Sequence, residues 1–223
     1  MNQERSIDIS PIIQQAALDP FISISKLKEI CNICLHFNFS GLSTSLNKLK
    51  EARELIPKGS RTKLISVIAF PFGDIKEEHK LKEAEWAEIN GADELELVPD
   101  YLSIIENKPD KYAQEIASIC TIGLPVRVIL NSQNIEKEKL SVAISAAIDA
   151  GASSLQIGNG FGEPILPERI NQFIDLTSNK HEIKAVGGIR LLDQVIQLHD
   201  AGATKIGTSF GLQIMNELKR KKH

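Results

Sequence analysis

The sequence predicts an α/β protein built as one (β/α)8 barrel, the TIM barrel, over residues 1–223. Short apolar segments alternate with amphipathic segments along the whole chain, which is typical of parallel strands joined by helices. The length of 223 residues is close to the roughly 250 residues of a plain barrel. A glycine-alanine-polar tripeptide recurs at 91–93, 151–153 and 202–204, each time where a helix is expected to end. We expect each of these glycines to adopt the left-handed conformation that follows a helix C-terminus.

In chain order, the expected strands are 12–17, 39–44, 63–70, 92–98, 125–131, 154–157, 182–186 and 203–208. The clearest helices between them are 24–37, 75–90, 135–150, 191–201 and 211–219. The basic residues 219–223 are expected to form a frayed helix end. The main alternative is an open doubly wound sheet, which usually carries G-x-G-x-x-G after its first strand. The first strand here contains no glycine, so the barrel is favoured.

Composition and charge narrow the class of protein. The formal net charge of −3 argues against a general nucleic-acid-binding protein, because affinity for a phosphate backbone needs a basic face. No apolar run approaches the length of a membrane span, and the polar start carries no signal-peptide core. A cytoplasmic protein without a membrane partner is therefore expected. The histidines lie on polar helix faces without metal-ligand spacing, so neither a metal site nor a cofactor is expected.

The last two expected strands each end in a glycine-rich turn. In this fold, the turns after strands seven and eight form the usual phosphate site, because their backbone N–H groups meet an anion there. The predicted phosphate-binding residues are Gly187, Gly188, Gly207, Thr208, Ser209 and Asn159. The sequence therefore predicts a phosphorylated ligand.

Side-chain alternation along the strands directs Glu96, Gln156 and Lys184 into the barrel, because their apolar neighbours suit the helix side. Lys184 is the one inward cation that we expect. An ordinary lysine has a pKa of about 10.4, so its amine attacks a carbonyl only if burial or a second cation lowers that pKa. The alternative is that Lys184 is the counter-ion of a phosphate or carboxylate. Further polar candidates for the barrel mouth are Gln14, Gln15 and Asn131.

Five segments together resemble the deoxyribose-phosphate aldolase family in their order and spacing: 66–73, 90–98, 160–162, 186–190 and 202–209. The resemblance extends along nearly the full chain. It implies a TIM barrel and the ancestry of a class I, metal-free aldolase. Members of that family cleave 2-deoxyribose 5-phosphate to acetaldehyde and glyceraldehyde 3-phosphate. They are commonly dimers, so the resemblance implies a sugar-phosphate ligand and a homodimer.

The resemblance also identifies departures within the active site. Gln156 stands where the family has its Schiff-base lysine, and an amide nitrogen cannot form an iminium. Lys184 matches the second lysine, which lowers the pKa of the first, and Glu96 aligns with a proton-relaying aspartate. Other positions that differ are Gln14, Gln15 and Ala16 on strand one, Ser43 and Ser45 on strand two, Asn131 on strand five, and Phe210 after strand eight.

Three functions are compatible with this pattern, and the candidate catalytic residues are Lys184, Glu96 and Gln156. One is a family member that binds a phosphorylated sugar or aldehyde without aldolase (carbon–carbon lyase) activity, or acts through a partner protein. Another is an active aldolase in which Lys184 forms the Schiff base, with its pKa lowered by burial or by an inward-facing Lys205. The third is a different lyase or isomerase that uses Glu96 as the base and Lys184 as an electrostatic anchor.

Overall fold

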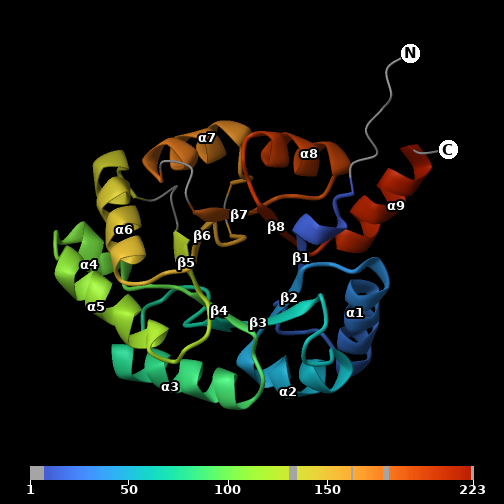
Figure 1. Ribbon diagram of the computed structural model, residues 1–223, viewed down its shortest axis with the longest axis horizontal. Coiled ribbons are helices and arrows are strands. Elements are labelled where there is room, and N and C mark those ends of the chain that lie inside the picture. The colour runs from blue at the N-terminus through green and yellow to red at the C-terminus, as the bar shows by residue number, and fades with distance from the viewer. Residues whose placement is uncertain (1–7, 131–134, 162, 178–180, 222–223) are drawn as a thin grey trace.

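The computed structural model describes residues 8–130, 135–161, 163–177 and 181–221, so the candidate Asn131 lies outside the described residues. Eight parallel strands pair in chain order, and β1 pairs with β8 to close the barrel (Figure 1). The predicted TIM barrel is therefore confirmed. The strands are β1 Ile13–Ala17, β2 Gly41–Thr44, β3 Lys63–Ile68, β4 Glu94–Leu97, β5 Val126–Leu130, β6 Ser154–Ile157, β7 Glu182–Val186 and β8 Lys205–Thr208.

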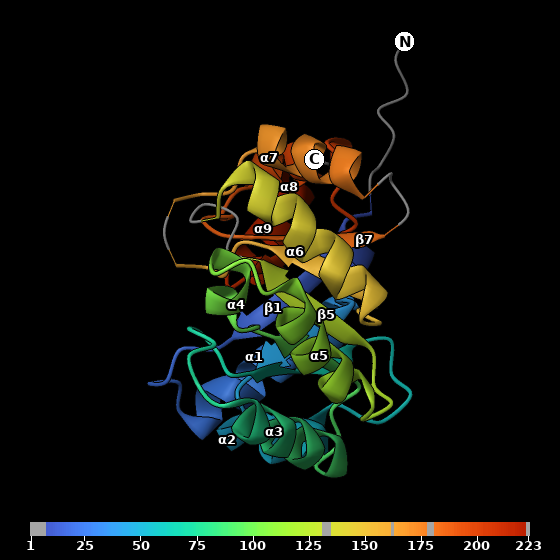
Figure 2. The same ribbon diagram turned by 90° about the vertical axis from the view of Figure 1, so that its left-hand side faces the viewer.

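Helices surround the barrel on its outside (Figure 1). They are α1 Ile24–Phe37, α2 Leu46–Leu55, α3 Glu77–Ile89, α4 Tyr101–Ile105, α5 Pro109–Cys120, α6 Lys137–Asp149, α7 Pro167–Leu176, α8 Leu192–Asp200 and α9 Gly211–Lys221, and a 3-10 helix, Ser10–Ile12, precedes β1. An eight-unit barrel predicts one helix between β4 and β5, whereas the structure has two there, α4 and α5. Figure 2 shows α4, α5 and α6 packed side by side on one flank.

The three glycine-alanine-polar corners have the conformation that the sequence predicts. Their glycines have φ values of +93°, +99° and +108° at positions 91, 151 and 202. In each corner the alanine N–H donates to a carbonyl five residues earlier, at 2.9 to 3.0 Å, which satisfies the helix C-terminus. The next N–H donates to the preceding strand, as Asp93 does to the Leu64 carbonyl at 2.7 Å. Each corner therefore ends one helix and sets the register of the following strand.

Two element ends differ from the prediction. β3 stops at Ile68 rather than at residue 70, because Ala69 has a φ of +57° and its N–H donates to the Glu83 carboxylate at 2.7 Å. The basic end expected to fray is helical through Lys221. The Lys221 ammonium lies 2.7 Å from the Asp193 carboxylate on α8, which anchors the last turn, and residues 222–223 lie outside the described part.

The strands separate an apolar layer from a polar interior. Leu95 and Leu97 on β4 are fully buried in the hydrophobic core that the helices cover, whereas Glu96 between them belongs to the inner face. This arrangement is the period-two alternation of a strand that is buried on both sides. Over the described residues, none of the helices combines the length and apolar character that crossing a bilayer requires.

Candidate active site at the barrel mouth

The carboxyl ends of the strands surround a cavity of about 440 Å³. Its lining includes every site residue that the sequence predicts: Lys184, Glu96, Gln156, Gly187, Gly188, Gly207, Thr208, Ser209 and Asn159. These residues come from β4, β6, β7, β8 and the turns after them. The structure thus gathers the predicted set in one place, and the roles of the individual residues stay predictions.

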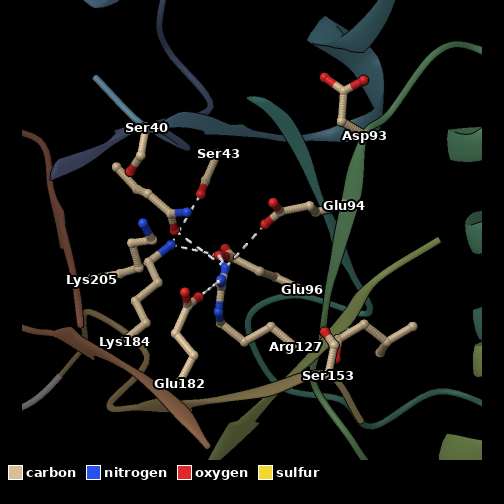
Figure 3. Close-up of polar contacts among 12 residues, drawn as sticks. Ser40, Ser43, Asp93, Glu94, Glu96, Arg127, Ser153, Glu182, Lys184 and Lys205 are labelled. Carbon is tan, nitrogen blue, oxygen red and sulfur yellow. Dashed lines mark hydrogen bonds and ion pairs between the residues drawn. The ribbon is translucent and has the colours of Figure 1, made fainter. Parts of the chain in front are cut away.

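Lys184 lies inside the barrel on β7 and is 2% exposed. Its Nζ donates to the Glu96 Oε1 at 2.5 Å and to the Ser43 Oγ at 3.2 Å (Figure 3). Gly207 on the neighbouring strand provides the space for this side chain. A Cβ atom at position 207 would lie 2.6 Å from the Lys184 Cε, which is closer than real Cβ atoms approach other atoms.

A second buried cation, which the sequence analysis missed, makes the expectation of one inward cation wrong. Arg127 on β5 is 4% exposed and points into the barrel (Figure 3). Its Nη1 donates to the Glu96 Oε1 at 3.0 Å, and its Nη2 donates to the Glu182 Oε1 at 2.7 Å. We call Lys184, Glu96, Arg127 and Glu182 the charged cluster. The signal was available, because Arg127 has the same strand parity as Asn131, which the sequence analysis directed to the mouth.

The charged cluster changes the pKa values of its members. Burial alone would raise the pKa of Glu96, but Lys184 and Arg127 outweigh it, so the pKa of this carboxyl lies below its ordinary value. Burial lowers the pKa of Lys184; Glu96 opposes that effect and Arg127 adds to it, so the net direction is downward. The pKa of Glu94, at the start of β4, is raised by burial against the attraction of Arg127. The site therefore favours an ionised carboxylate beside an amine that loses its proton more readily than usual.

Gln156 lies next to Lys184, because the two residues are direct partners in the pairing of β6 with β7. It is 3% exposed, and its Nε2 donates to the Gly158 carbonyl at 3.0 Å. Its Oε1 is buried and has no hydrogen-bond partner among the described residues. A buried acceptor of this kind costs about 1–3 kcal/mol until a donor reaches it. The floor of the cavity therefore contains an acceptor that a ligand hydroxyl can satisfy.

The turns after β7 and β8 are shaped by backbone conformation. Gly187 and Gly188 have φ values of +128° and +68°, where side chains are disfavoured. A Cβ at position 188 would lie 2.8 Å from the Pro164 Cβ, so the close approach of the preceding loop also requires glycine. Gly187 and Gly188 both line the cavity, and successive backbone N–H groups in such turns are the kind of group that binds an anion.

Several predicted polar groups are already used within the protein. The Thr208 hydroxyl donates to the Ile189 carbonyl at 2.6 Å and accepts from the Phe210 N–H at 3.0 Å, so it holds the turn rather than facing a ligand. The Asn159 Oδ1 accepts from the Phe161 N–H at 3.0 Å. The Thr208 hydroxyl and the Asn159 Oδ1 therefore already have hydrogen-bond partners within the protein, and a ligand would have to contact other groups of these two residues.

Three further expectations concern polar residues outside the cavity lining. Gln14 does point into the barrel, but it is not part of the cavity lining, and its Oε1 accepts from the Arg127 Nη1 at 3.2 Å. The expectation that Gln15 faces the mouth is wrong: adjacent strand residues face opposite sides, and its Oε1 accepts from the Gly211 N–H of α9 at 3.1 Å. Lys205 donates to the Pro11 carbonyl at 3.2 Å, so the second cation beside Lys184 is Arg127 instead. Over the described residues, no group of three or more His, Cys, Asp or Glu is placed to hold a metal ion.

Comparison with known proteins places this cavity in context. The chain is 32% identical to the deoxyribose-phosphate aldolase of Trichormus variabilis over 213 residues, which cover 95% of this chain and 94% of the relative. It is 30% identical to the corresponding enzyme of Picosynechococcus over 95% of this chain and 92% of that one. A solved structure described as QR15, an aldolase, superposes with a TM-score of 0.92 at 28% identity, covering 97% and 98% of the two chains. No protein-family model matches.

A closed parallel barrel with an inward lysine–carboxylate pair beside two glycine turns defines an aldolase-type barrel of class I. The near full-length likeness to the Trichormus enzyme is more specific, and the chain belongs to the deoxyribose-phosphate aldolase family. The resemblance inferred from the sequence segments is thereby confirmed. That Gln156 occupies the position of the family's Schiff-base lysine stays a prediction.

Proposed function

We propose that this family member binds a phosphorylated sugar or aldehyde in the cavity without forming a Schiff base on β6. The glycine turns after β7 and β8 receive the phosphate, and the carbonyl end of the ligand lies toward Gln156 and Lys184. The observation that carries the proposal is the Gln156 carboxamide, which lines the cavity and whose buried Oε1 has no hydrogen-bond partner in the described part of the chain. The amide nitrogen has no free lone pair for attack on a carbonyl, but the oxygen accepts a hydrogen bond from a ligand hydroxyl.

An active aldolase is the second candidate, and Lys184 is the residue that favours it. Among the described residues that line the cavity, Lys184 is the only lysine, and burial and Arg127 lower its pKa. In that case the neutral amine attacks the ligand carbonyl, and loss of water from the carbinolamine gives the iminium. Glu96 is placed to take the proton that the ammonium gives up beforehand, since Nζ already donates to it at 2.5 Å.

The test combines thermal denaturation with borohydride trapping. For a ligand at about 100 times its Kd, the stabilisation of about 2.7 kcal/mol raises the Tm by roughly 5–10 °C in a domain of this size. We expect 2-deoxyribose 5-phosphate to raise the Tm in a saturable way, unphosphorylated deoxyribose to have no effect, and borohydride to leave the protein mass unchanged. An adduct that maps to Lys184 would support the aldolase instead. If no phosphorylated sugar raises the Tm, the binding proposal is wrong.

Two variants complete this experiment. Gln156→Lys restores an amine on β6 next to Lys184, and we expect it to gain a borohydride-trapped adduct at position 156. Lys184→Met removes the amine that wild type has in the cavity and is the control for any adduct on the native chain. If Gln156→Lys binds the sugar phosphate and still gives no adduct, the missing β6 amine does not explain the absence of Schiff-base chemistry.

We also propose a cytoplasmic homodimer, on the basis of the family relationship. A solved relative at 25% identity and a TM-score of 0.84 is described as a tetrameric deoxyribose phosphate aldolase from Aeropyrum pernix. Light scattering of the purified chain distinguishes the two states, and a tetramer or monomer mass would contradict the homodimer.

A further inference from the structure

We propose that Arg127 is a positioning residue of the cavity: it holds the Glu96 carboxylate against Lys184 and thereby sets which protonation state the amine presents to a ligand. The inference concerns the same cavity as the proposed function, but it holds whether Lys184 binds a ligand as a cation or attacks it as an amine.

The Glu96 carboxylate is shared between two cations. Glu96 Oε1 accepts from both cations, from Arg127 Nη1 at 3.0 Å and from Lys184 Nζ at 2.5 Å (Figure 3). One carboxylate oxygen is therefore shared, and the hydrogen bond from Arg127 reduces the stabilisation that Glu96 gives to the Lys184 ammonium. All three side chains are nearly or completely buried, so solvent screens their interactions little.

Groups on three other strands hold Arg127 in place. Its guanidinium donates to Gln14 at 3.2 Å and to Glu182 at 2.7 Å, and Glu94 lies 3.6 Å away. These contacts come from β1, β7 and β4, so the guanidinium is held from several sides of the barrel. A planar guanidinium can bridge such partners, whereas a lysine ammonium is a single point charge on a flexible stem. Arg127 is thus held against Glu96 and is not part of the cavity lining that the glycine turns help to form.

Sharing of the Glu96 carboxylate affects the protonation of Lys184. With Glu96 shared, an ammonium at Lys184 faces a second positive charge across the same oxygen, and a like charge this close disfavours its protonated form. The remaining charged groups around Lys184 are Glu94 on β4, Glu182 at the start of β7, Lys205 on β8, and Asp19 and Arg190 at the cavity mouth. Burial and Arg127 both lower the pKa of Lys184, with Glu96 opposing them. The function of Arg127 is thus to partly cancel the stabilisation that Glu96 gives the ammonium.

The experiment measures the protonation of Lys184 directly. Trace acetylation with acetic anhydride, quantified by peptide mass spectrometry from pH 6 to 11, reports the neutral fraction of each lysine. An exposed lysine such as Lys28 is the internal reference. Because labelling needs no sugar phosphate, a negative result here leaves the binding proposal untouched, and failure of ligand binding leaves this test valid.

Arg127→Met removes the positive charge at similar volume, and we expect the labelling midpoint of Lys184 to move up by about one pH unit, so that labelling at pH 7.5 slows about tenfold. Arg127→Lys keeps a cation and should stay within about threefold of wild type. The matched control is Arg53→Met. Arg53 forms a partly buried ion pair with Asp93 at 2.6 Å outside the barrel interior, and its loss should leave the midpoint unchanged.

Glu182→Gln gives the opposite sign and protects the test against a misfolded Arg127→Met. Glu182 is 38% exposed, so its replacement by an isosteric amide is expected to be tolerated. Loss of this anion leaves the Arg127 charge less compensated, and labelling of Lys184 at pH 7.5 should speed up by roughly twofold. An unchanged midpoint in a folded Arg127→Met, or slower or unchanged labelling in Glu182→Gln, would overturn the proposal.

Discussion

The glycine turns after β7 and β8 and the charged cluster share strand β7 and meet at the cavity, which Lys184 and Glu96 also line, but the two regions are held together differently. In the turns, φ values of +128° and +68° at Gly187 and Gly188 set the shape of the backbone, and the Thr208 hydroxyl ties the two turns to each other. In the charged cluster, side chains from β4, β5 and β7 keep one another in place through opposite charges. One region depends on backbone conformation and the other on charge balance.

This difference predicts how each region responds to change. A substitution in a turn alters a local shape, and its cost is steric. A substitution in the charged cluster leaves the remaining buried charges uncompensated, and breaking a buried pair in this way usually costs more than the pair itself contributes. The four predictions below test that contrast, from the largest expected effect to the smallest.

Glu96→Gln should have the largest effect, because it leaves Lys184 and Arg127 facing each other without the shared carboxylate. We expect the free energy of unfolding, measured by urea denaturation at pH 7, to fall by about 3–5 kcal/mol. Glu182→Gln is the matched control: its carboxylate is 38% exposed, so it should cost far less. Equal losses in the two variants would contradict the distinction between the buried centre and the edge of the charged cluster.

The stability difference between wild type and Glu96→Gln should depend on pH. The pKa of Glu96 is lowered in the folded state from its ordinary value of 4.5. The stability that this carboxylate contributes is therefore fully present above about pH 4.5 and is lost as the pH falls through the folded-state pKa. The stability difference between wild type and Glu96→Gln should shrink as the pH is lowered from 4.5. A constant difference down to pH 3 would show that packing, and not charge, explains the effect.

Gly207→Ala tests the place where the two regions meet. The new Cβ would lie 2.6 Å from both the Lys184 Cε and the Val186 Cγ2, and overpacking of this kind costs about 1–3 kcal/mol. We expect lower stability, weaker binding of the sugar phosphate and altered acetylation of Lys184. Gly59→Ala is the control, because its added Cβ meets no atom within 4 Å and its φ of +81° confines the cost to the backbone. If acetylation of Lys184 is unchanged in Gly207→Ala, the turn after β8 does not affect the charged cluster, and this prediction is wrong.

Ser43→Ala should have the smallest effect. It removes the 3.2 Å hydrogen bond from Lys184 to the Ser43 hydroxyl, worth about 0.5–1.5 kcal/mol, and leaves the contact with Glu96 intact. Ser40→Ala removes a comparable bond to the Ile13 carbonyl outside the charged cluster. Thermal denaturation should show similar small losses for both variants. Only Ser43→Ala should change the acetylation rate of Lys184, and a change in both would count against a local effect.

The fold was predictable because its signals are local. The corners at Gly91, Gly151 and Gly202 need only a helix end and a positive φ, and α1 has the predicted bounds of 24–37. The division of the segment between β4 and β5 into two helices was not predicted, although Asp100 accepts from the Leu102 N–H at the start of α4 and Pro109 begins α5. Both are standard signals for a helix start.

The site was predictable only in part. Strand parity identified Glu96, Gln156 and Lys184, because each is a single polar residue between apolar neighbours. Arg127 obeys the same rule, but an arginine can also extend to solvent, and its partners lie on strands distant in sequence. Gln14 and Gln15 show the limit of composition: parity allows only one of two adjacent glutamines to face inward. Some of these polar side chains bond within the protein and others stay available to a ligand. That division depends on contacts between distant parts of the chain, which no local sequence pattern contains.

The Gln15 carboxamide joins the last helix to the first strand. The Gly211 N–H at the start of α9 donates to it at 3.1 Å, directly beside the β1–β8 pairing that closes the barrel. A helix start ordinarily offers such an amide to solvent or to an anion. Here the Gln15 oxygen occupies this amide beside the paired strands β1 and β8, so we expect the Gly211 amide hydrogen to exchange slowly with solvent and its exchange rate to report on that pairing.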